Sequence, residues 1–366
     1  MQSTIHLTLH ELAIPGYTDL SHICETDSFT IYRALTLEGQ YVFIKAPTPA
    51  RPPVQLIRQL EHELEIAIDL NPEYVIRPIK IERNKDHTLL ILEPCAYPPL
   101  TKLMQAPLEM AIFLPIAAGI AEALSEVHRH GLVHKEIQPE NIFAISSGQV
   151  KLTGFGIASR LTREQRPPDP AELIADTLAY IAPEQTGRMN RSIDSRSDLY
   201  ALGVTFYQML TGSLPFTASD PMEWVHCHIA IQPKPPIECL GTIPEPLSRL
   251  VMKLLAKTAE ERYQTAEGLQ ADLQHCLDEW RTQGCILPFP LGMSDIPCHL
   301  TIPEKLYGRE REVKTLLAAF NRVVASGRPE LILVSGYSGI GKSAVVNEWR
   351  KALVPSRALF AGGKFD

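Results

Sequence analysis

The segment GYSGIGKS, residues 336–343, holds the densest group of phosphate-binding residues in the sequence, and it fits the Walker A pattern GxxxxGK[ST] without a mismatch. In such a P-loop, backbone amides at a helix N-terminus surround the phosphates of a nucleotide. Lys342 is expected to contact the β- and γ-phosphate oxygens, and Ser343 to hold Mg²⁺. Glycine lets the backbone approach the phosphates closely, which is the expected role of Gly336, Gly339 and Gly341. The pattern therefore predicts an ATP-binding site.

The residues around this loop predict a strand before it and a helix after it. LILV, residues 331–334, is typical of a strand, whereas residues 310–326 and 343–354 have helical patterns. YGREREVKTLLAAF, residues 307–320, resembles the opening segment of signalling ATPases of the AAA/STAND type. The sequence ends 23 residues after Ser343, too few for the acidic second strand and arginine sensor of such an ATPase. Residues 304–366 are therefore expected to be the truncated start of an α/β P-loop NTPase domain, in a fragment of a longer chain with exposed apolar side chains.

A second series of motifs resembles a protein kinase domain in its order and spacing. The series consists of VFIK at 42–45, Glu63, LVHKEIQPENIF at 132–143, KLTGFGIASRL at 151–161, APE at 182–184, Asp198 and Arg262. The resemblance implies an α+β, bilobal protein-kinase fold with a small β-rich N-lobe and a helical C-lobe. Residues 178–216 are more specifically similar to large bacterial signalling proteins, in which a Ser/Thr-kinase-like domain precedes a P-loop ATPase, GAF modules and a histidine kinase.

The kinase resemblance implies a role for each charged or amide side chain in these motifs. Lys45 would hold nucleotide phosphates and pair with Glu63, which lies 18 residues later on a helix expected over residues 54–70. Glu136 would accept a proton as a catalytic residue, and Asn141 would be a metal ligand. These four residues, together with the P-loop, form the candidate nucleotide sites.

The glycine-rich loop of the kinase family is altered in this sequence. Cys24, Thr26 and Phe29 stand at its three glycine positions. A side chain at each position keeps the backbone amides away from phosphates. We expect a stiffer loop that fits phosphates badly.

The metal turn and the catalytic loop depart further from the family. Gly154 stands at the place of the metal-binding aspartate, so no carboxylate there bridges Mg²⁺ between phosphates. Glu136 replaces an aspartate, and its extra methylene moves the carboxylate by about 1.5 Å. A misplacement of about 1 Å can cost on the order of 100-fold in rate. Gln138 replaces a lysine and brings no charge, and Phe43 replaces the alanine that roofs the adenine pocket.

The residues that build the kinase fold are kept: His134, Asn141, Phe155, Ala182, Glu184, Asp198 and Arg262. The resemblance implies that Asp198 lies buried beneath the catalytic loop and that Arg262 pairs with Glu184. This contrast predicts a pseudokinase that acts as a scaffold or regulatory domain of a multidomain sensor kinase. Its expected partners are other proteins or the C-terminal domains of the full-length protein. The alternative is an active but atypical ATP-dependent Ser/Thr protein kinase, in which Lys45 and Asn141 hold ATP and Glu136 is the base. ATP and Mg²⁺ are expected at the P-loop, and in the kinase-like domain only under this alternative.

Composition shifts divide the chain into three parts. Residues 14–280 are expected to form the kinase-like domain, and residues 304–366 the ATPase segment. Between them, GCILPFPLGMSDIPCHLTIP lies in a stretch rich in proline and glycine, residues 281–303, which predicts a linker.

The overall composition excludes several classes of protein. Lysine and arginine number 35 against 42 acidic residues, so there is no basic footprint for nucleic acid. The longest uncharged apolar run, residues 110–121, contains Pro115 and is too short to span a bilayer. Seven cysteines without a CxxC pair favour a reducing cytoplasm over a disulfide framework. The run His226-Cys227-His228 is not expected to bind metal, because neighbouring residues on a helix point apart.

Overall fold

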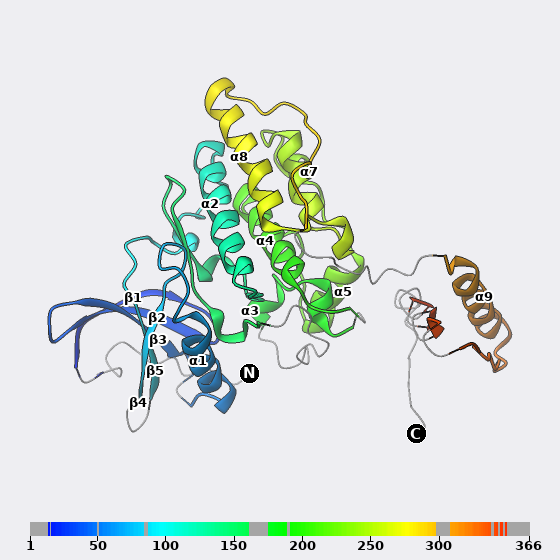
Figure 1. The fold of residues 1–366 in the computed structure, drawn as a ribbon, viewed down its shortest axis with the longest axis horizontal. Helices are drawn as coiled ribbons and strands as arrows, with labels where there is room; N and C mark the ends of the chain where they lie inside the picture. Colours follow the sequence, from blue (N-terminus) through cyan, green and yellow to red (C-terminus); the bar gives the residue numbers. More distant parts are fainter. Residues whose placement is uncertain are drawn as a thin grey trace. The chain divides into compact units, whose positions relative to one another are not determined.

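The computed structural model describes residue 14 and residues 16–49, 51–83, 87–160, 175–188, 191–297, 308–337, 340–342, 345–346 and 348–349. The chain divides into two compact units. The first comprises residues 1–188 and 192–298, and the second residues 189–191 and 299–366. The first unit holds the sheet and most of the helices, and each unit is described by itself (Figure 1).

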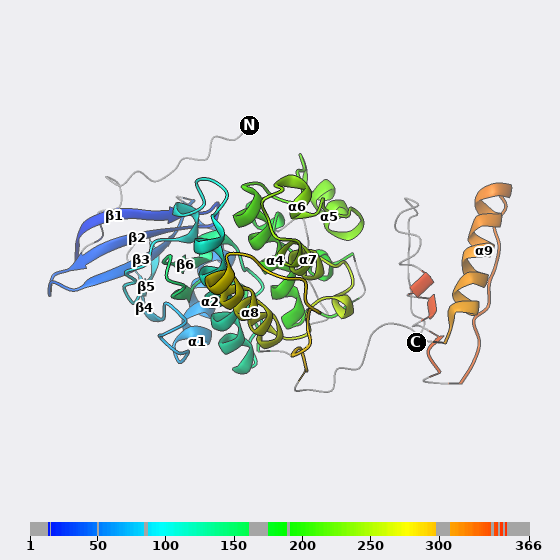
Figure 2. The same cartoon turned by 90° about the horizontal axis from the view of Figure 1, so that it is seen from above.

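The N-lobe of the first unit is an antiparallel sheet of five strands in the order β1-β2-β3-β5-β4. Its elements are β1 (Tyr17–Glu25), β2 (Phe29–Thr36), β3 (Tyr41–Pro47), α1 (Val54–Ala67), β4 (Pro78–Arg83) and β5 (Thr88–Leu92). Successive side chains of a strand point to opposite faces. Ile31 and Phe43 accordingly enter one apolar cluster, while Tyr32 and Ile44 enter another. Figure 2 shows the sheet at one end of this unit.

Helix α1 carries Glu63 on the face that packs into the domain. The predicted helix over residues 54–70 is present, but it ends at Ala67. Leu56, Leu60 and Ile66 are buried, and Glu63 is buried on the same side. The three- and four-residue spacing of these positions explains why one charged residue is drawn inside with the apolar ones.

The C-lobe is mainly helical and is built around one large apolar core. Its elements are η1 (Leu100–Lys102), α2 (Met110–Arg129), η2 (Pro139–Asn141), β6 (Ile142–Ala144), β7 (Val150–Leu152), η3 (Phe155–Ile157), α3 (Ala175–Leu178), η5 (Pro183–Thr186), α4 (Ser195–Thr211), α5 (Pro221–Ala230), α6 (Pro236–Cys239), α7 (Glu245–Leu254), η6 (Ala259–Glu261) and α8 (Ala266–Gln283). Helices α2 and α8 lie side by side in both ribbon views. The α+β, two-lobed architecture expected from the sequence is confirmed.

Helix α2 runs without a break through Pro115. Proline removes one backbone donor from a helix interior. Burial of most of the apolar side chains of α2 outweighs that loss, as tertiary packing supplies most helix stability. Within the described residues, one helix, α2, is long and apolar enough to cross a membrane. However, 72% of its most apolar stretch is buried inside the protein.

Residues 284–297, which we call the return segment, pack against the C-lobe. The sequence predicts a linker from residue 281, whereas α8 continues to Gln283 and the chain then turns back at Gly284 (φ +67°). Ile286 is buried, and the ring of Phe289 lies edge-on to His275, with centroids 4.5 Å apart. Figure 1 shows this segment running from the end of α8 back along the helices.

The second unit contains α9 (Glu310–Ser326), which has the bounds expected from the sequence. The predicted strand at residues 331–334 is wrong, because residues 327–337 are not in a strand. A strand requires a neighbour that pairs with its backbone groups. The apolar side chains here are exposed as the sequence leads one to expect, with Leu331 at 95% and Leu333 at 87%.

Candidate active site

The loop of residues 132–141 is held in place by Asp198, a buried residue of α4. The Asp198 carboxylate accepts hydrogen bonds from the backbone N–H groups of His134 (2.8 Å) and Lys135 (2.7 Å). It also contacts Nε2 of His128 at 2.9 Å. These bonds support the left-handed conformation of Lys135, whose φ is +68° and which strains a residue with a side chain. The expected position of Asp198 beneath the catalytic loop is confirmed.

His134 connects this loop to the strand that leads into the metal turn. The backbone N–H of Glu136 donates to Nδ1 of His134, so Nε2 carries the proton and donates to the Thr153 carbonyl at 2.9 Å. Burial is the main cause that lowers the pKa of His134, which keeps the ring neutral. The ring also packs on Phe155, with centroids 4.5 Å apart.

Lys45 and Glu63 form the ion pair that the sequence predicts. Nζ of Lys45 lies 2.6 Å from Oε2 of Glu63, and both side chains are almost fully buried. The other carboxylate oxygen of Glu63 accepts the backbone N–H of Gly154 at 2.9 Å. Glu63 therefore ties β3 to the turn that would bind metal in the kinase family.

The turn at Gly154 has no room for a side chain. Gly154 adopts a left-handed conformation, with φ +87°. A Cβ added there would lie about 2.5 Å from the amide group of Asn141. Nδ2 of Asn141 donates to the Glu136 carbonyl at 2.9 Å, which fixes the amide against the turn. The missing aspartate could not be restored without moving Asn141.

Aromatic side chains occupy the space between the lobes. The rings of Phe43 and Phe143 lie 5.8 Å apart, and both residues are buried. They share one apolar cluster with Cys24, Phe29 and residues of α1 and β5. Phe43, which stands where the kinase family has the alanine over the adenine pocket, therefore packs in an apolar cluster.

Phe29 covers the ammonium group that would meet phosphates. Nζ of Lys45 lies 4.6 Å from the centroid of the Phe29 ring, and Lys45 is only 4% exposed. The stacking is favourable because the ring face attracts a cation. The side chain at a former glycine position thus blocks the lysine directly, in addition to stiffening the loop.

Glu136 lies partly buried near Lys45, Glu63 and Glu140. Burial raises the pKa of Glu136 to about 7, and the neighbouring carboxylates add to that effect while Lys45 opposes it. A carboxyl group with this pKa can accept or release a proton near neutral pH. Gln138, at the position of the family's lysine, is buried at 3% exposure.

The residues of the cleft do not fit Mg²⁺ with ATP. Hard cations require several oxygen ligands, preferably carboxylates. Asn141 offers one neutral amide oxygen, Gly154 offers no side chain, and both oxygens of Glu63 are engaged. Within the described part of the chain, no group of three or more histidine, cysteine, aspartate or glutamate side chains could hold a metal ion.

The two histidines of the run His226-Cys227-His228 have different surroundings. His226 is exposed, whereas His228 is buried and contacts the Tyr200 hydroxyl (3.0 Å) and the Leu178 carbonyl (2.9 Å). His228 also stacks on Trp224, with ring centroids 5.9 Å apart. Its role in the described structure is packing.

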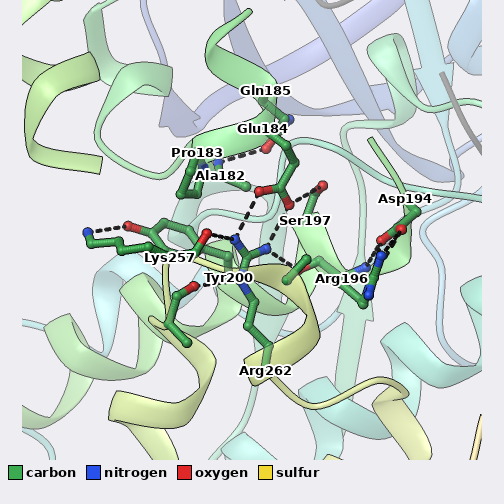
Figure 3. A network of polar contacts seen from close by, with 12 residues as sticks. Ala182, Pro183, Glu184, Gln185, Asp194, Arg196, Ser197, Tyr200, Lys257 and Arg262 are labelled. Carbon is green, nitrogen blue, oxygen red and sulfur yellow. Dashed lines mark hydrogen bonds and ion pairs between the residues drawn. The ribbon is translucent and has the colours of Figure 1, made fainter. Parts of the chain in front are cut away.

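The end of the activation segment is anchored by a buried ion pair, shown in Figure 3. Nη1 and Nη2 of Arg262 bind the two oxygens of Glu184 at 2.7 and 2.9 Å, and Ser197 donates to the same carboxylate. Burial raises the pKa of Glu184, but Arg262 and the hydrogen bonds outweigh it, so the pKa lies below its usual value. The expected pairing of Arg262 with Glu184 is confirmed.

In the second unit, Lys342 bonds to its own loop. Its ammonium group donates to the carbonyls of Gly336 (2.9 Å) and Tyr337 (2.8 Å). Gly341 has φ +95°, a conformation that glycine adopts freely. The pattern residue Ser343 and the further loop glycine Gly339, both predicted to contribute to nucleotide binding, lie outside the described residues.

Sequence models of two known protein families match this chain. The sequence model of the protein kinase domain matches residues 17–273, which is more than half of the sequence. The chain belongs to the protein kinase domain family. A model of the AAA ATPase domain matches residues 305–366. These two families imply the use of ATP, with Mg²⁺.

Three curated proteins that are similar to this chain are named as kinases. Hybrid signal transduction histidine kinase G of Dictyostelium discoideum is 28% identical over 71% of this chain and 10% of its own length. Serine/threonine-protein kinase Pkn1 of Myxococcus xanthus is 30% identical over 62% of this chain and 33% of its own. PknB of Mycolicibacterium smegmatis is 34% identical over 44% of this chain and 25% of its own. The chain thus spans a third or less of the length of these relatives.

Two features of the site were not anticipated from the sequence. Phe143 packs on Phe43, and the Asn141 amide fills the space beside Gly154. For the packing of Phe143 on Phe43, the only signal in the sequence is an aromatic residue two positions after Asn141. The contact of Asn141 with Gly154 has no sequence signal, because it depends on the geometry of the turn.

Proposed function

We propose that the kinase domain of this chain is a pseudokinase, which acts as a scaffold or regulatory module in a larger signalling protein. The observation that carries this proposal is the enclosure of Lys45. Its ammonium group is bound by Glu63 at 2.6 Å and covered by the Phe29 ring. A nucleotide phosphate would have to displace the ring and compete with a buried ion pair.

The loss of metal ligands supports the same proposal. Phosphoryl transfer depends on positioning and charge neutralisation, for which the kinase family uses metal-bound carboxylates. Gly154 has no carboxylate and no space for one, because Asn141 lies against it. The cleft therefore lacks the means to neutralise the charge that develops in the transfer.

Nucleotide binding to the cleft can be tested in the chain of residues 1–366 carrying Lys342→Ala, which silences the P-loop. A ligand at 100 times its Kd stabilises a protein by about 2.7 kcal/mol. We expect no thermal shift with millimolar ATP and either Mg²⁺ or Mn²⁺, and no phosphate incorporation into a protein substrate. A shift or incorporation that is lost when Lys45→Ala is added would overturn the proposal.

A second candidate is an active but atypical ATP-dependent Ser/Thr kinase, and Glu136 is the observation that favours it. A partly buried carboxyl group with a pKa of about 7 is suited to accept the proton of a hydroxyl substrate. Under this function, phosphotransfer should rise as the pH increases through 7. Glu136→Gln should abolish both the activity and its pH dependence, while the exposed control Glu38→Gln should leave them unchanged.

The P-loop segment and the relatives support a multidomain setting. We place ATP with Mg²⁺ at the P-loop of the longer protein, and we expect GAF and histidine kinase modules to follow it. The likeness to a hybrid histidine kinase over 71% of this chain supports that arrangement. The partners would be proteins or these further domains. Six described cysteines are all free, which fits a cytoplasmic location.

A further inference from the structure

We propose that the return segment, residues 284–297, is a regulatory strap that sets the position of the activation-segment anchor Glu184–Arg262. The strap lies between the two family matches, which end at residue 273 and begin at residue 305, so it is part of the covalent connection between the two domains. The inference extends the regulatory role proposed above, and it holds whether or not the cleft transfers phosphate.

The strap is fixed at the N-terminus of α8 by Asp295. One oxygen of Asp295 accepts the backbone N–H of Gln264 at 2.6 Å. The other accepts both the backbone N–H (2.9 Å) and the hydroxyl (2.8 Å) of Thr265, the residue that caps α8. A carboxylate is favoured at this end of a helix by unpaired amides and the helix dipole. Three hydrogen bonds therefore hold the strap to residues 264 and 265.

Residue 264 leads directly to the anchor. Oε1 of Gln264 accepts a hydrogen bond from Nη1 of Arg196 at 3.1 Å, and its Nε2 donates to the Arg262 carbonyl at 2.8 Å. The carbonyl of Arg196 in turn accepts Nη1 of Arg262 at 3.0 Å. Figure 3 shows Arg196 and Arg262 beside Glu184. Every link from Asp295 to Glu184 is thus a hydrogen bond between buried or partly buried groups.

The anchor continues to the catalytic loop. Gln185, next to Glu184, donates from Nε2 to the Lys135 carbonyl at 3.0 Å and accepts the backbone N–H of Ala182. Lys135 is the loop residue held in its strained conformation by Asp198. A displacement of the strap can therefore reach the loop that carries Glu136 through contiguous contacts.

The fit of the strap against α8 is close. A Cβ added to Gly268 would lie 2.5 Å from Cβ and Oδ1 of Asp295, so only glycine lets the strap dock. Two further contacts lie along the way: the Gly292 N–H donates to Asp272 at 2.7 Å, and the Leu287 N–H donates to Glu279 at 2.8 Å. Because the packing is close, a displacement of the strap would also displace residue 264.

Amide hydrogen exchange on the chain of residues 1–366 tests the coupling. Asp295→Ala should accelerate exchange at residues 182–186, which Asp295 does not touch, by about 5-fold or more. Amides of α2 should be unchanged. The matched control Asp278→Ala removes an exposed carboxylate from α8 and should alter neither region. Acceleration confined to residues 262–297, or spread equally to α2, would overturn the proposal, since it would show local or global loosening only.

Two more variants keep the test decisive if Asp295→Ala is poorly folded. Gly268→Ala favours the helix locally but excludes the strap, so it should reproduce the acceleration at residues 182–186. Gln264→Ala keeps the backbone bond to Asp295 and removes the link to Arg196 and Arg262. It should accelerate exchange at the anchor by itself, and adding Asp295→Ala should then have no further effect there. Additive effects in the double variant would contradict the route through Gln264.

Discussion

The cleft between the lobes and the anchor around Glu184 both contain a buried ion pair, but their surroundings differ. Arg262 and Glu184 are joined by a bidentate contact. Ser197 donates a further hydrogen bond to Glu184, and the Ala256 carbonyl accepts one from Arg262. Lys45 and Glu63 lie among aromatic rings at positions that the kinase family uses for nucleotide. The anchor is thus a network of charged and polar groups, whereas the ion pair of the cleft lies beside an apolar cluster that contains Phe29, Phe43 and Phe143.

The largest expected effect is on the anchor. Arg262→Ala leaves the Glu184 carboxylate buried without its cation and should lower the free energy of unfolding by about 3–5 kcal/mol. Urea denaturation measures it. Arg249→Ala breaks an exposed pair with Glu245 and should cost no more than about 1 kcal/mol. Equal costs for the two variants would show that the anchor is not a principal support of the fold.

The cleft should respond to truncation as a hydrophobic core does. Phe43→Ala removes a buried ring packed on Phe143 and should lower the free energy of unfolding by about 3–5 kcal/mol. Leu37→Ala, at 80% exposure, should change it by no more than about 0.5 kcal/mol. If Phe43→Ala instead stabilised the chain and enabled ATP binding, the ring would be an obstruction and not a packing element.

Restoring the aspartate of the metal turn should fail for steric reasons. Gly154→Asp places a side chain at φ +87° against Asn141 and should cost about 1–2 kcal/mol from the backbone alone. No phosphotransfer should appear, even together with Glu136→Asp. Adding Asn141→Gly should recover part of the stability, and thermal denaturation of the single and double variants measures both effects. A Gly154→Asp variant that is as stable as the parent chain would refute this geometry.

The raised pKa of Glu136 introduces a pH dependence of stability. Its pKa is about 7 in the folded state against an ordinary value of 4.5, so the folded state binds this proton more tightly. Its stabilising contribution is fully present below pH 4.5 and is lost as the pH rises through 7. Glu136→Gln should therefore flatten the stability curve between pH 4.5 and 8 and raise stability at pH 8. The same slope in Glu38→Gln and Glu136→Gln would exclude this assignment.

Motif order was sufficient to predict the kinase fold and several of its contacts. The resemblance to the kinase family implied the ion pair of Lys45 with Glu63 and that of Arg262 with Glu184, and both are present. Helix bounds were also close, because α1 and α9 have strong apolar periodicity. The strand at residues 331–334 was wrong, since an apolar run specifies a strand only where a neighbour can pair with it.

The sequence by itself determined the motifs that resemble a protein kinase, and that resemblance implied the two lobes and showed which charged residues of the family are absent, because motifs depend on residue type and local spacing. Only the tertiary structure decided which side chains lie at the places of the missing residues and how the strap docks. Phe29 covers Lys45, Asn141 lies against Gly154, and Asp295 docks on Gly268. Each contact joins segments that are distant along the chain, and each depends on packing to within a few tenths of an ångström. Residue spacing does not encode such distances, which are fixed when the whole domain closes around its core.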